Sequence, residues 1–218
     1  MKMKLYRINI NDLDDPQQNK GLLESVGEKR REKILRYYKP EDRKRSLGAG
    51  IIIERILNEN GLSEGNLKYS ENGKPVADNL FFNVSHAGDY VVGVSSDCDV
   101  GCDIEKISAA PFEIAEHYFN QSEIEYIESE ADKNKAFFTL WTLKESYMKM
   151  TGMGMSLPLD SFEIIKTEKG FVLGRSQEKH GFFKTIEFDD HIFSVCSEKE
   201  KINTSVLQPL LSSEKAIL

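Results

Sequence analysis

The segment VGCDIEKI, residues 100–107, has the alternation of a β-strand and carries two carboxylates two positions apart. Successive side chains of a strand point to opposite faces, so Asp103 and Glu105 share one face while Cys102 and Ile104 share the other. Acidic residues are poor strand formers and neighbouring like charges repel, so a compensating partner is expected. Two interpretations stay open: solvent along a half-exposed strand, or a divalent cation held by carboxylate oxygens.

Outward from this segment, helical and strand-like patterns follow each other in blocks. The expected helices are 22–38, 41–57, 112–119, 122–130 and 133–150, and the expected strands are 5–10, 80–84, 90–94, 100–107, 162–165, 171–173, 182–188 and 192–196. Helices followed by strands, twice over, predict an α+β fold instead of alternating βαβ units. The turn-prone segment KISAAP, residues 106–111, places the expected boundary between an N-terminal half, 1–107, and a C-terminal half, 108–218.

Composition indicates an ordinary folded protein. The chain has 218 residues, of which 39% are hydrophobic and 30% charged. Its start has no apolar stretch typical of a secretory signal, and no run of about 18 apolar residues follows, so we expect a cytoplasmic protein without membrane contact. The three cysteines, Cys98, Cys102 and Cys196, lack metal-ligand spacing and are odd in number, which argues against both structural zinc and a disulfide framework.

The charge is unevenly distributed along the chain. The net charge of −7 opposes binding to nucleic acid or to anionic membranes. Residues 28–45 nevertheless hold nine basic against four acidic side chains. This basic segment indicates either a local polyanion site or a solvated helix face.

The segment FFTLWTLKESYMKMT, residues 137–151, predicts a helix with two charged residues on its apolar side. Lys144 and Glu145 fall within the broad apolar arc that contains Trp141 and Met148, with Lys149 at its edge. Because an unpaired buried charge is costly, each should have a specific partner. The alternative is an ordinary surface pair between Glu145 and Lys149. If Glu145 instead points toward the strand with the two carboxylates, three carboxylates converge, as magnesium or manganese would require.

Together these segments resemble the 4'-phosphopantetheinyl transferases of the surfactin-synthetase-activating type. The resemblance rests on VGCDIEKI and on LWTLKESYMKMTGMGMSLPL, and it extends over most of the chain through three further segments: EKRREKILRYYKPEDRKRS (28–46), GKP (73–75) and FFNVSHAGD (81–89). It implies transfer of the phosphopantetheine arm of coenzyme A to a serine of an apo acyl or peptidyl carrier protein, with release of adenosine 3',5'-bisphosphate. It also implies two similar α+β halves that form a pseudodimer, with the active site in the cleft between them.

The resemblance also implies roles for individual residues. Asp103, Glu105 and Glu145 are similar to the family's ligands for Mg²⁺, with Mn²⁺ as an alternative, and Glu145 to the residue usually proposed as base. Lys149 and Lys144 would stabilise charge on the phosphates. Six residues match positions at the nucleotide end of coenzyme A: Arg30, Lys33, Arg45, Lys74, Ser85 and His86.

Two departures from the family pattern concern single contacts. Ala87 stands where a second serine is frequent, and Arg30 where a lysine is frequent. The length matches the pseudodimeric type, so we predict a monomer. Two other functions stay open: a nonenzymatic coenzyme A or nucleotide-binding module, and a metal-dependent phosphohydrolase. Nucleic-acid binding is the weakest alternative, because the basic segment lacks an aromatic platform.

Overall fold

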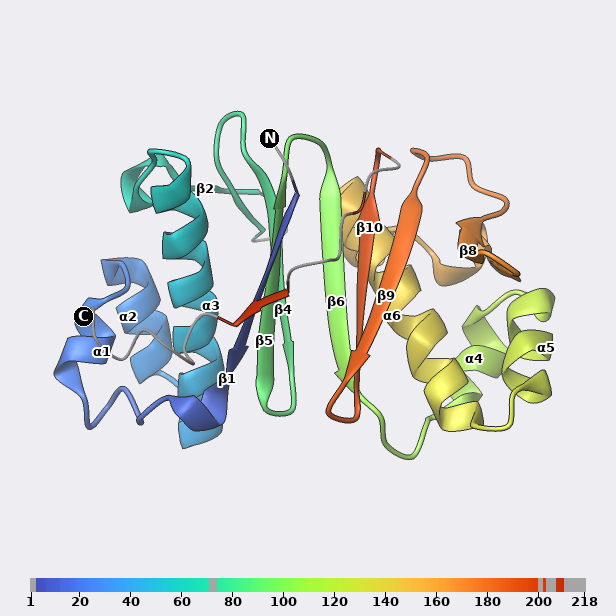
Figure 1. Cartoon of the computed structure of the whole chain (residues 1–218), viewed down its shortest axis with the longest axis horizontal. Helices are drawn as coiled ribbons and strands as arrows, with labels where there is room; N and C mark the ends of the chain where they lie inside the picture. The colour runs from blue at the N-terminus through green and yellow to red at the C-terminus, as the bar shows by residue number, and fades with distance from the viewer. Residues whose placement is uncertain (1–2, 71–73, 200–201, 203–206, 210–218) are drawn as a thin grey trace.

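The structure is a computed structural model that describes residues 3–70, 74–199, 202 and 207–209. Two sheets lie in the middle of the molecule, and helices cover the outer side of each (Figure 1). Gly73 of the GKP motif and most of the chain beyond residue 199 lie outside the described residues. The predicted α+β architecture of two similar halves is confirmed, because each half consists of three helices packed on one sheet.

The N-terminal sheet has the strand order β11-β1-β5-β4, in which only the β11–β1 pair is parallel. Its strands are β1 (Lys4–Asn9), β4 (Phe81–Ala87), β5 (Tyr90–Ser96) and β11 (Leu207–Pro209), and its helices are α1 (Lys20–Glu24), α2 (Glu28–Leu35) and α3 (Pro40–Glu59). A small separate sheet pairs β2 (Lys68–Tyr69) with β3 (Pro75–Val76). The expected helix 22–38 is divided into α1 and α2, because the chain leaves the helical path at residues 25–27 and Gly27 becomes the N-cap of α2.

The C-terminal sheet has the strand order β6-β10-β9-β8-β7 and is antiparallel. Its strands are β6 (Val100–Lys106), β7 (Ile164–Thr167), β8 (Gly170–Leu173), β9 (Phe182–Phe188) and β10 (His191–Ser197), and its helices are α4 (Phe112–Tyr118), α5 (Gln121–Ser129) and α6 (Lys133–Thr151). The expected boundary at 107 places β6 in the N-terminal half. Its hydrogen-bonded neighbour is β10, with Asp103 opposite Ser194, so β6 belongs to the C-terminal sheet.

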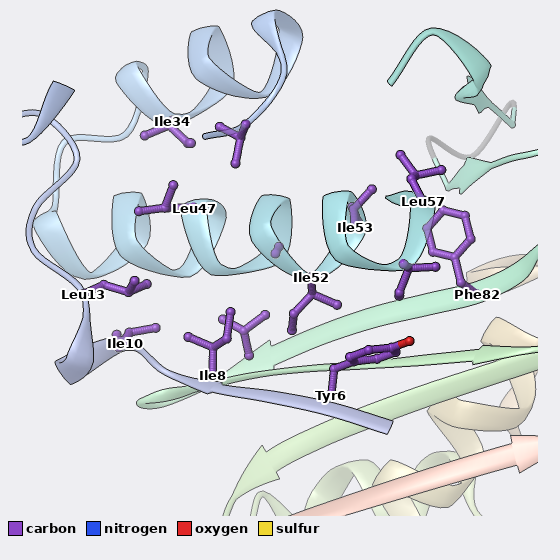
Figure 2. Packing of buried hydrophobic residues seen from close by; sticks show 14 of the residues in the cluster. Tyr6, Ile8, Ile10, Leu13, Ile34, Leu47, Ile52, Ile53, Leu57 and Phe82 are labelled. Atoms are coloured by element: carbon purple, nitrogen blue, oxygen red, sulfur yellow. The ribbon is translucent and has the colours of Figure 1, made fainter. Parts of the chain in front are cut away.

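Three apolar cores separate these layers. The first lies between α3 and the N-terminal sheet, where Ile52 packs above Tyr6 and Ile8 (Figure 2). The second lies between α6 and the C-terminal sheet. The third core fills the space between the two sheets. Residues of the N-terminal sheet that point away from α3, such as Leu5 from β1 and Val92 from β5, contribute to this third core. Strand β5 is therefore covered on both faces, which explains its run of buried residues.

The three cysteines are buried and free. Among the described residues, no helix combines the length and apolarity needed to span a bilayer.

Gly101 sets the distance between β6 and α6. A Cβ atom at this position would lie 2.1 Å from the carbonyl oxygen of Ser146 and 2.4 Å from the backbone nitrogen of Met150. Both atoms belong to the helix backbone, which cannot move aside as a side chain does. Only glycine therefore allows this approach, and the next residues on the same face of β6 lie directly against α6.

We expect Gly101→Ala to force α6 away from β6 and to lower the free energy of unfolding by about 1–3 kcal/mol, the usual cost of overpacking. Thermal and denaturant unfolding measure this loss. The matched control is Gly21→Ala in the exposed helix α1, where the nearest atom to a new Cβ is Asn19 Oδ1 at 3.5 Å. A Gly101→Ala variant as stable as the control would contradict the close packing described here.

Candidate functional site

Strand β6 and helix α6 place three carboxylates beside one lysine. Asp103 and Glu105 lie on the face of β6 that Gly101 turns toward α6, and Glu145 and Lys149 come from α6. These four side chains line one pocket of about 380 Å³, here called the acidic pocket, together with Val84, Ser85, His86 and Trp141. The three predicted carboxylates thus line the same pocket.

Asp103 is the most enclosed of these carboxylates, with 4% of its surface exposed. Its Oδ1 accepts hydrogen bonds from Ser85 Oγ at 2.8 Å and from Lys149 Nζ at 2.5 Å. Within the described ranges, its Oδ2 is buried and has no hydrogen-bond partner. A buried carboxylate oxygen without a partner is costly, so the arrangement fits a cation that supplies one.

The other two carboxylates lack sufficient counter-charge. Burial, followed by the charges of Asp103 and Glu145, raises the pKa of Glu105 to about 7. Burial and the charge of Asp103 also raise the pKa of Glu145. Lys149 shows the opposite effect: burial disfavours its charge, yet the Asp103 carboxylate holds its pKa above the usual value. One ammonium group is therefore shared among three carboxylates.

The donor set suits a hard divalent cation. In the part of the chain that is described, no group of three or more His, Cys, Asp or Glu side chains is gathered closely enough to hold a metal ion by itself. Magnesium typically takes only one or two protein carboxylates and completes its shell with substrate phosphates and water. The buried Asp103 Oδ2 and the raised pKa of Glu105 fit such a shared site.

A second cavity, of about 350 Å³, adjoins the acidic pocket and is lined by cations. We call it the basic cavity. It contains five of the six residues predicted at the nucleotide end, namely Arg30, Lys33, Arg45, Lys74 and His86, and also Lys149. The two cavities share Val84, His86 and Lys149.

Two cations of the basic cavity, Arg45 and Lys74, are held in place by hydrogen bonds to neighbouring oxygens. Arg45 donates from Nη1 to the Gly88 carbonyl at 2.8 Å and from Nη2 to Asp42 at 2.5 Å. Lys74 donates to the Lys149 carbonyl at 2.8 Å, near the end of α6. Burial lowers the pKa of Lys74. An anionic ligand would relieve this desolvation, so the cavity is suited to phosphate groups.

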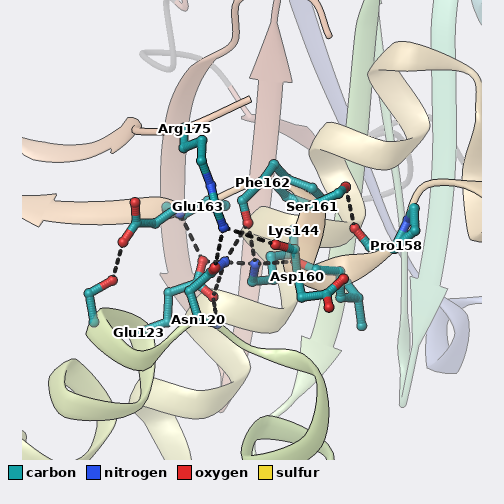
Figure 3. A network of polar contacts seen from close by, with 12 residues as sticks. Asn120, Glu123, Lys144, Pro158, Asp160, Ser161, Phe162, Glu163 and Arg175 are labelled. Atoms are coloured by element: carbon teal, nitrogen blue, oxygen red, sulfur yellow. Dashed lines mark hydrogen bonds and ion pairs between the residues drawn. The ribbon is translucent and has the colours of Figure 1, made fainter. Parts of the chain in front are cut away.

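Lys144 corrects the prediction that it would face the phosphates. It is fully buried and pairs with Glu123, also fully buried, at 2.8 Å (Figure 3). Its ammonium group also donates to the carbonyls of Leu159 and Phe162 at 2.8 and 3.1 Å. These three acceptors use all three of its protons. The specific partner expected for a charge in the apolar arc exists, but it lies in the core of the C-terminal half.

Two residues of the site escaped sequence reasoning. Ser46 on α3 lines the basic cavity, and among the described residues its buried Oγ has no hydrogen-bond partner. A serine on the apolar side of a helix can be recognised in a sequence, because the helical period of α3 places Ser46 on that side. Asn83 on β4 accepts a hydrogen bond from the Cys102 nitrogen at 2.9 Å and lines the basic cavity. Its role needs the spatial proximity of β4 and β6, which no local pattern reveals.

Comparison with known proteins gives the same family over residues 15–200. Residues 15–98 match the family model "4'-phosphopantetheinyl transferase, N-terminal", and residues 99–200 match "4'-phosphopantetheinyl transferase superfamily". The 4'-phosphopantetheinyl transferase ffp of Bacillus subtilis is 34% identical over 90% of this chain and 93% of its own. The 4'-phosphopantetheinyl transferase gsp of Aneurinibacillus migulanus is 35% identical over 81% and 78%. Among solved structures, holo-[acyl-carrier-protein] synthase of Thermotoga maritima aligns with a TM-score of 0.41 and 17% identity, over 45% of this chain and 61% of its own.

We expect Lys144→Met to destabilise the protein by about 3–5 kcal/mol, because it leaves the Glu123 carboxylate buried without its counter-ion. Urea unfolding measures the difference. Lys135→Met is the matched control on the same helix: Lys135 is 42% exposed and pairs with Glu187 at the surface, where an ion pair contributes about 0–1 kcal/mol. Equal losses in the two variants would contradict the structural role of Lys144.

Proposed function

This chain belongs to the 4'-phosphopantetheinyl transferase family, so it is an enzyme that transfers the 4'-phosphopantetheine arm of coenzyme A to carrier proteins. On that premise we propose how its own residues take part in the transfer. The observation that carries the proposal is the continuity of the basic cavity and the acidic pocket, with Lys149 lining both. A diphosphate bound in the basic cavity would lie next to Lys149, and the three carboxylates of the acidic pocket would lie beyond this lysine. Metal-assisted phosphoryl transfer needs such an arrangement, with cations on the phosphates and carboxylates that can hold a metal ion beside them.

The basic cavity binds the nucleotide end of coenzyme A in this proposal. Arg30 and Lys33 come from α2, and Arg45 comes from α3. Lys74 comes from the segment before β3, and His86 comes from β4. Their guanidinium and ammonium groups match the phosphates in charge, and an arginine fork also fits a phosphate in geometry.

Asp103, Glu105 and Glu145 would hold a divalent cation, with Mg²⁺ as the expected metal and Mn²⁺ as an alternative. When bound, such a cation neutralises charge on the diphosphate and lowers the barrier to its cleavage. The buried Asp103 Oδ2 supports this assignment, as does the raised pKa of Glu105, which results from burial and then from the charge of Asp103.

The reaction forms a bond from the carrier serine oxygen to the β-phosphorus and breaks the bond from that phosphorus to the bridging oxygen. Adenosine 3',5'-bisphosphate leaves with the bonding electrons. Glu145 accepts the serine proton as the general base. Lys149 donates to the phosphate oxygens, and its raised pKa keeps it protonated as their charge grows.

All proposed groups belong to a single chain. The basic cavity takes residues from α2, α3 and β4, and the acidic pocket takes residues from β4, β6 and α6. Because one chain supplies both cavities, we propose that the monomer is the functional unit. We also propose that the enzyme acts in the cytoplasm, as expected from the sequence.

The proposal is tested by intact-mass spectrometry of apo acyl and peptidyl carrier domains incubated with the enzyme, coenzyme A and Mg²⁺. We expect the carrier to gain one phosphopantetheinyl group and the gain to vanish with a chelator. Glu145→Gln and Asp103→Asn should each slow transfer by about 10²-fold or more, in the range found for groups that act on the transition state. Glu113→Gln on the exposed part of α4 is the control.

Three outcomes would contradict the proposal. Binding of coenzyme A without modification of any carrier would favour a binding module. Release of the bisphosphate without a carrier would favour a phosphohydrolase. Transfer that continues in chelator would overturn the metal assignment alone.

We expect Arg45→Ala to raise the dissociation constant of coenzyme A about 10–100-fold, because a hydrogen bond to a charged group contributes about 1.5–3 kcal/mol. Isothermal titration calorimetry without metal measures this change. Lys44→Ala, on the neighbouring position of α3, is the control because Lys44 lines a different surface hollow beside α1. If both variants bind coenzyme A like the wild type, Arg45 is not a phosphate contact.

A further inference from the structure

Ser85 lies where strand β4 meets strand β6. The strand β4 turns Phe82 and Val84 toward the core beneath α3, so Asn83 and Ser85 point to the other side, toward β6. Over the described residues, β4 and β6 belong to different sheets and share no backbone ladder. Two side chains connect them instead: Asn83 accepts from the Cys102 nitrogen, and Ser85 donates to Asp103.

The two oxygens of Asp103 have unequal surroundings because both Ser85 and Lys149 donate to Oδ1. Oδ1 accepts from Ser85 Oγ at 2.8 Å and from Lys149 Nζ at 2.5 Å, whereas Oδ2 accepts from no described residue. The carboxylate group is fixed at one end by its covalent bond to the side chain and at Oδ1 by two hydrogen bonds. These restraints limit its rotation and therefore determine the direction in which Oδ2 points. Partners of this kind orient metal ligands in many proteins.

The hydroxyl group of Ser85 has little left to offer coenzyme A. Its proton is used on Asp103, and it accepts from Lys149 Nζ at 3.2 Å. The residue is 9% exposed and lines the acidic pocket, whereas the other five residues predicted at the nucleotide end line the basic cavity.

We propose that Ser85 is a positioning residue that holds Oδ1 of Asp103 so that Oδ2 is presented to the divalent cation. This inference rests on the proposed function, because it assigns Asp103 to the metal. It replaces the role of Ser85 as a nucleotide contact that the family resemblance implied.

The test separates metal affinity from coenzyme A affinity. Mn²⁺ binding is followed by electron paramagnetic resonance at saturating coenzyme A, with free coenzyme A as a blank, and coenzyme A binding is followed by calorimetry without metal. We expect Ser85→Ala to weaken Mn²⁺ binding about 10–100-fold, the usual effect of removing such a partner, while coenzyme A binding stays near the wild-type value. Ser85→Thr, which keeps the hydroxyl group, should restore Mn²⁺ binding.

Two controls isolate the role of the hydroxyl group. Ser95→Ala removes another buried hydroxyl from the same sheet, one that contacts Tyr6 at 3.3 Å, and should change neither affinity. In an Asp103→Asn background, Ser85→Ala should cause no further loss of Mn²⁺ affinity, because Ser85 acts through Asp103.

Each remaining result decides against the inference or against its premise. Weaker coenzyme A binding with unchanged Mn²⁺ binding in Ser85→Ala would overturn the inference and restore the nucleotide contact. Equal losses in Ser85→Ala and Ser95→Ala would reduce Ser85 to a general stabilising residue. A wild-type protein that binds Mn²⁺ tightly but modifies no carrier would contradict the transfer mechanism while leaving the role of Ser85 testable on the same titration.

Discussion

The site depends on the close contact between strand β6 and helix α6 at Gly101. Without a side chain at this position, the strand backbone approaches the helix backbone directly. Since side chains on one face of a strand repeat every second residue, Asp103 and Glu105 follow Gly101 on that face. One helical turn separates Glu145 from Lys149, so both reach the same face of the strand. The chemistry of the site thus rests on an absent side chain.

The two adjoining cavities separate charges of opposite sign. Cations gather where α2 and α3 meet the N-terminal sheet, and carboxylates gather between β6 and α6. Lys149 belongs to both regions and neutralises Asp103 at 2.5 Å. Burial removes water from charged groups in both cavities, which raises the pKa of Glu105 and lowers the pKa of Lys74. A ligand with a diphosphate and a cation would relieve both kinds of strain at once.

Local patterns predicted most elements and the shared face of Asp103 and Glu105, because alternation and helical period depend on neighbours in the chain. They failed where partners are distant. The helical wheel placed Lys144 in the apolar arc, yet nothing local pointed to Glu123 on another helix. The sheet to which β6 belongs was missed for the same reason, since its partner β10 comes from the far end of the chain. Ser85 has a polar neighbour only because β4 and β6 meet in space.

The pairing of β6 with β10 also bears on the order in which the molecule can be built during synthesis. Strand β5 pairs with β1 and with β4 within the first hundred residues, whereas β6 must wait for β10, its hydrogen-bonded partner at residues 191–197. When the ribosome has finished β6, the backbone N–H and C=O groups that will pair with β10 are therefore still unpaired. Such non-local pairing slows folding and leaves an unpaired, aggregation-prone strand edge in the nascent chain. The charges of Asp103 and Glu105 then disfavour pairing of this strand with another chain until β10 arrives.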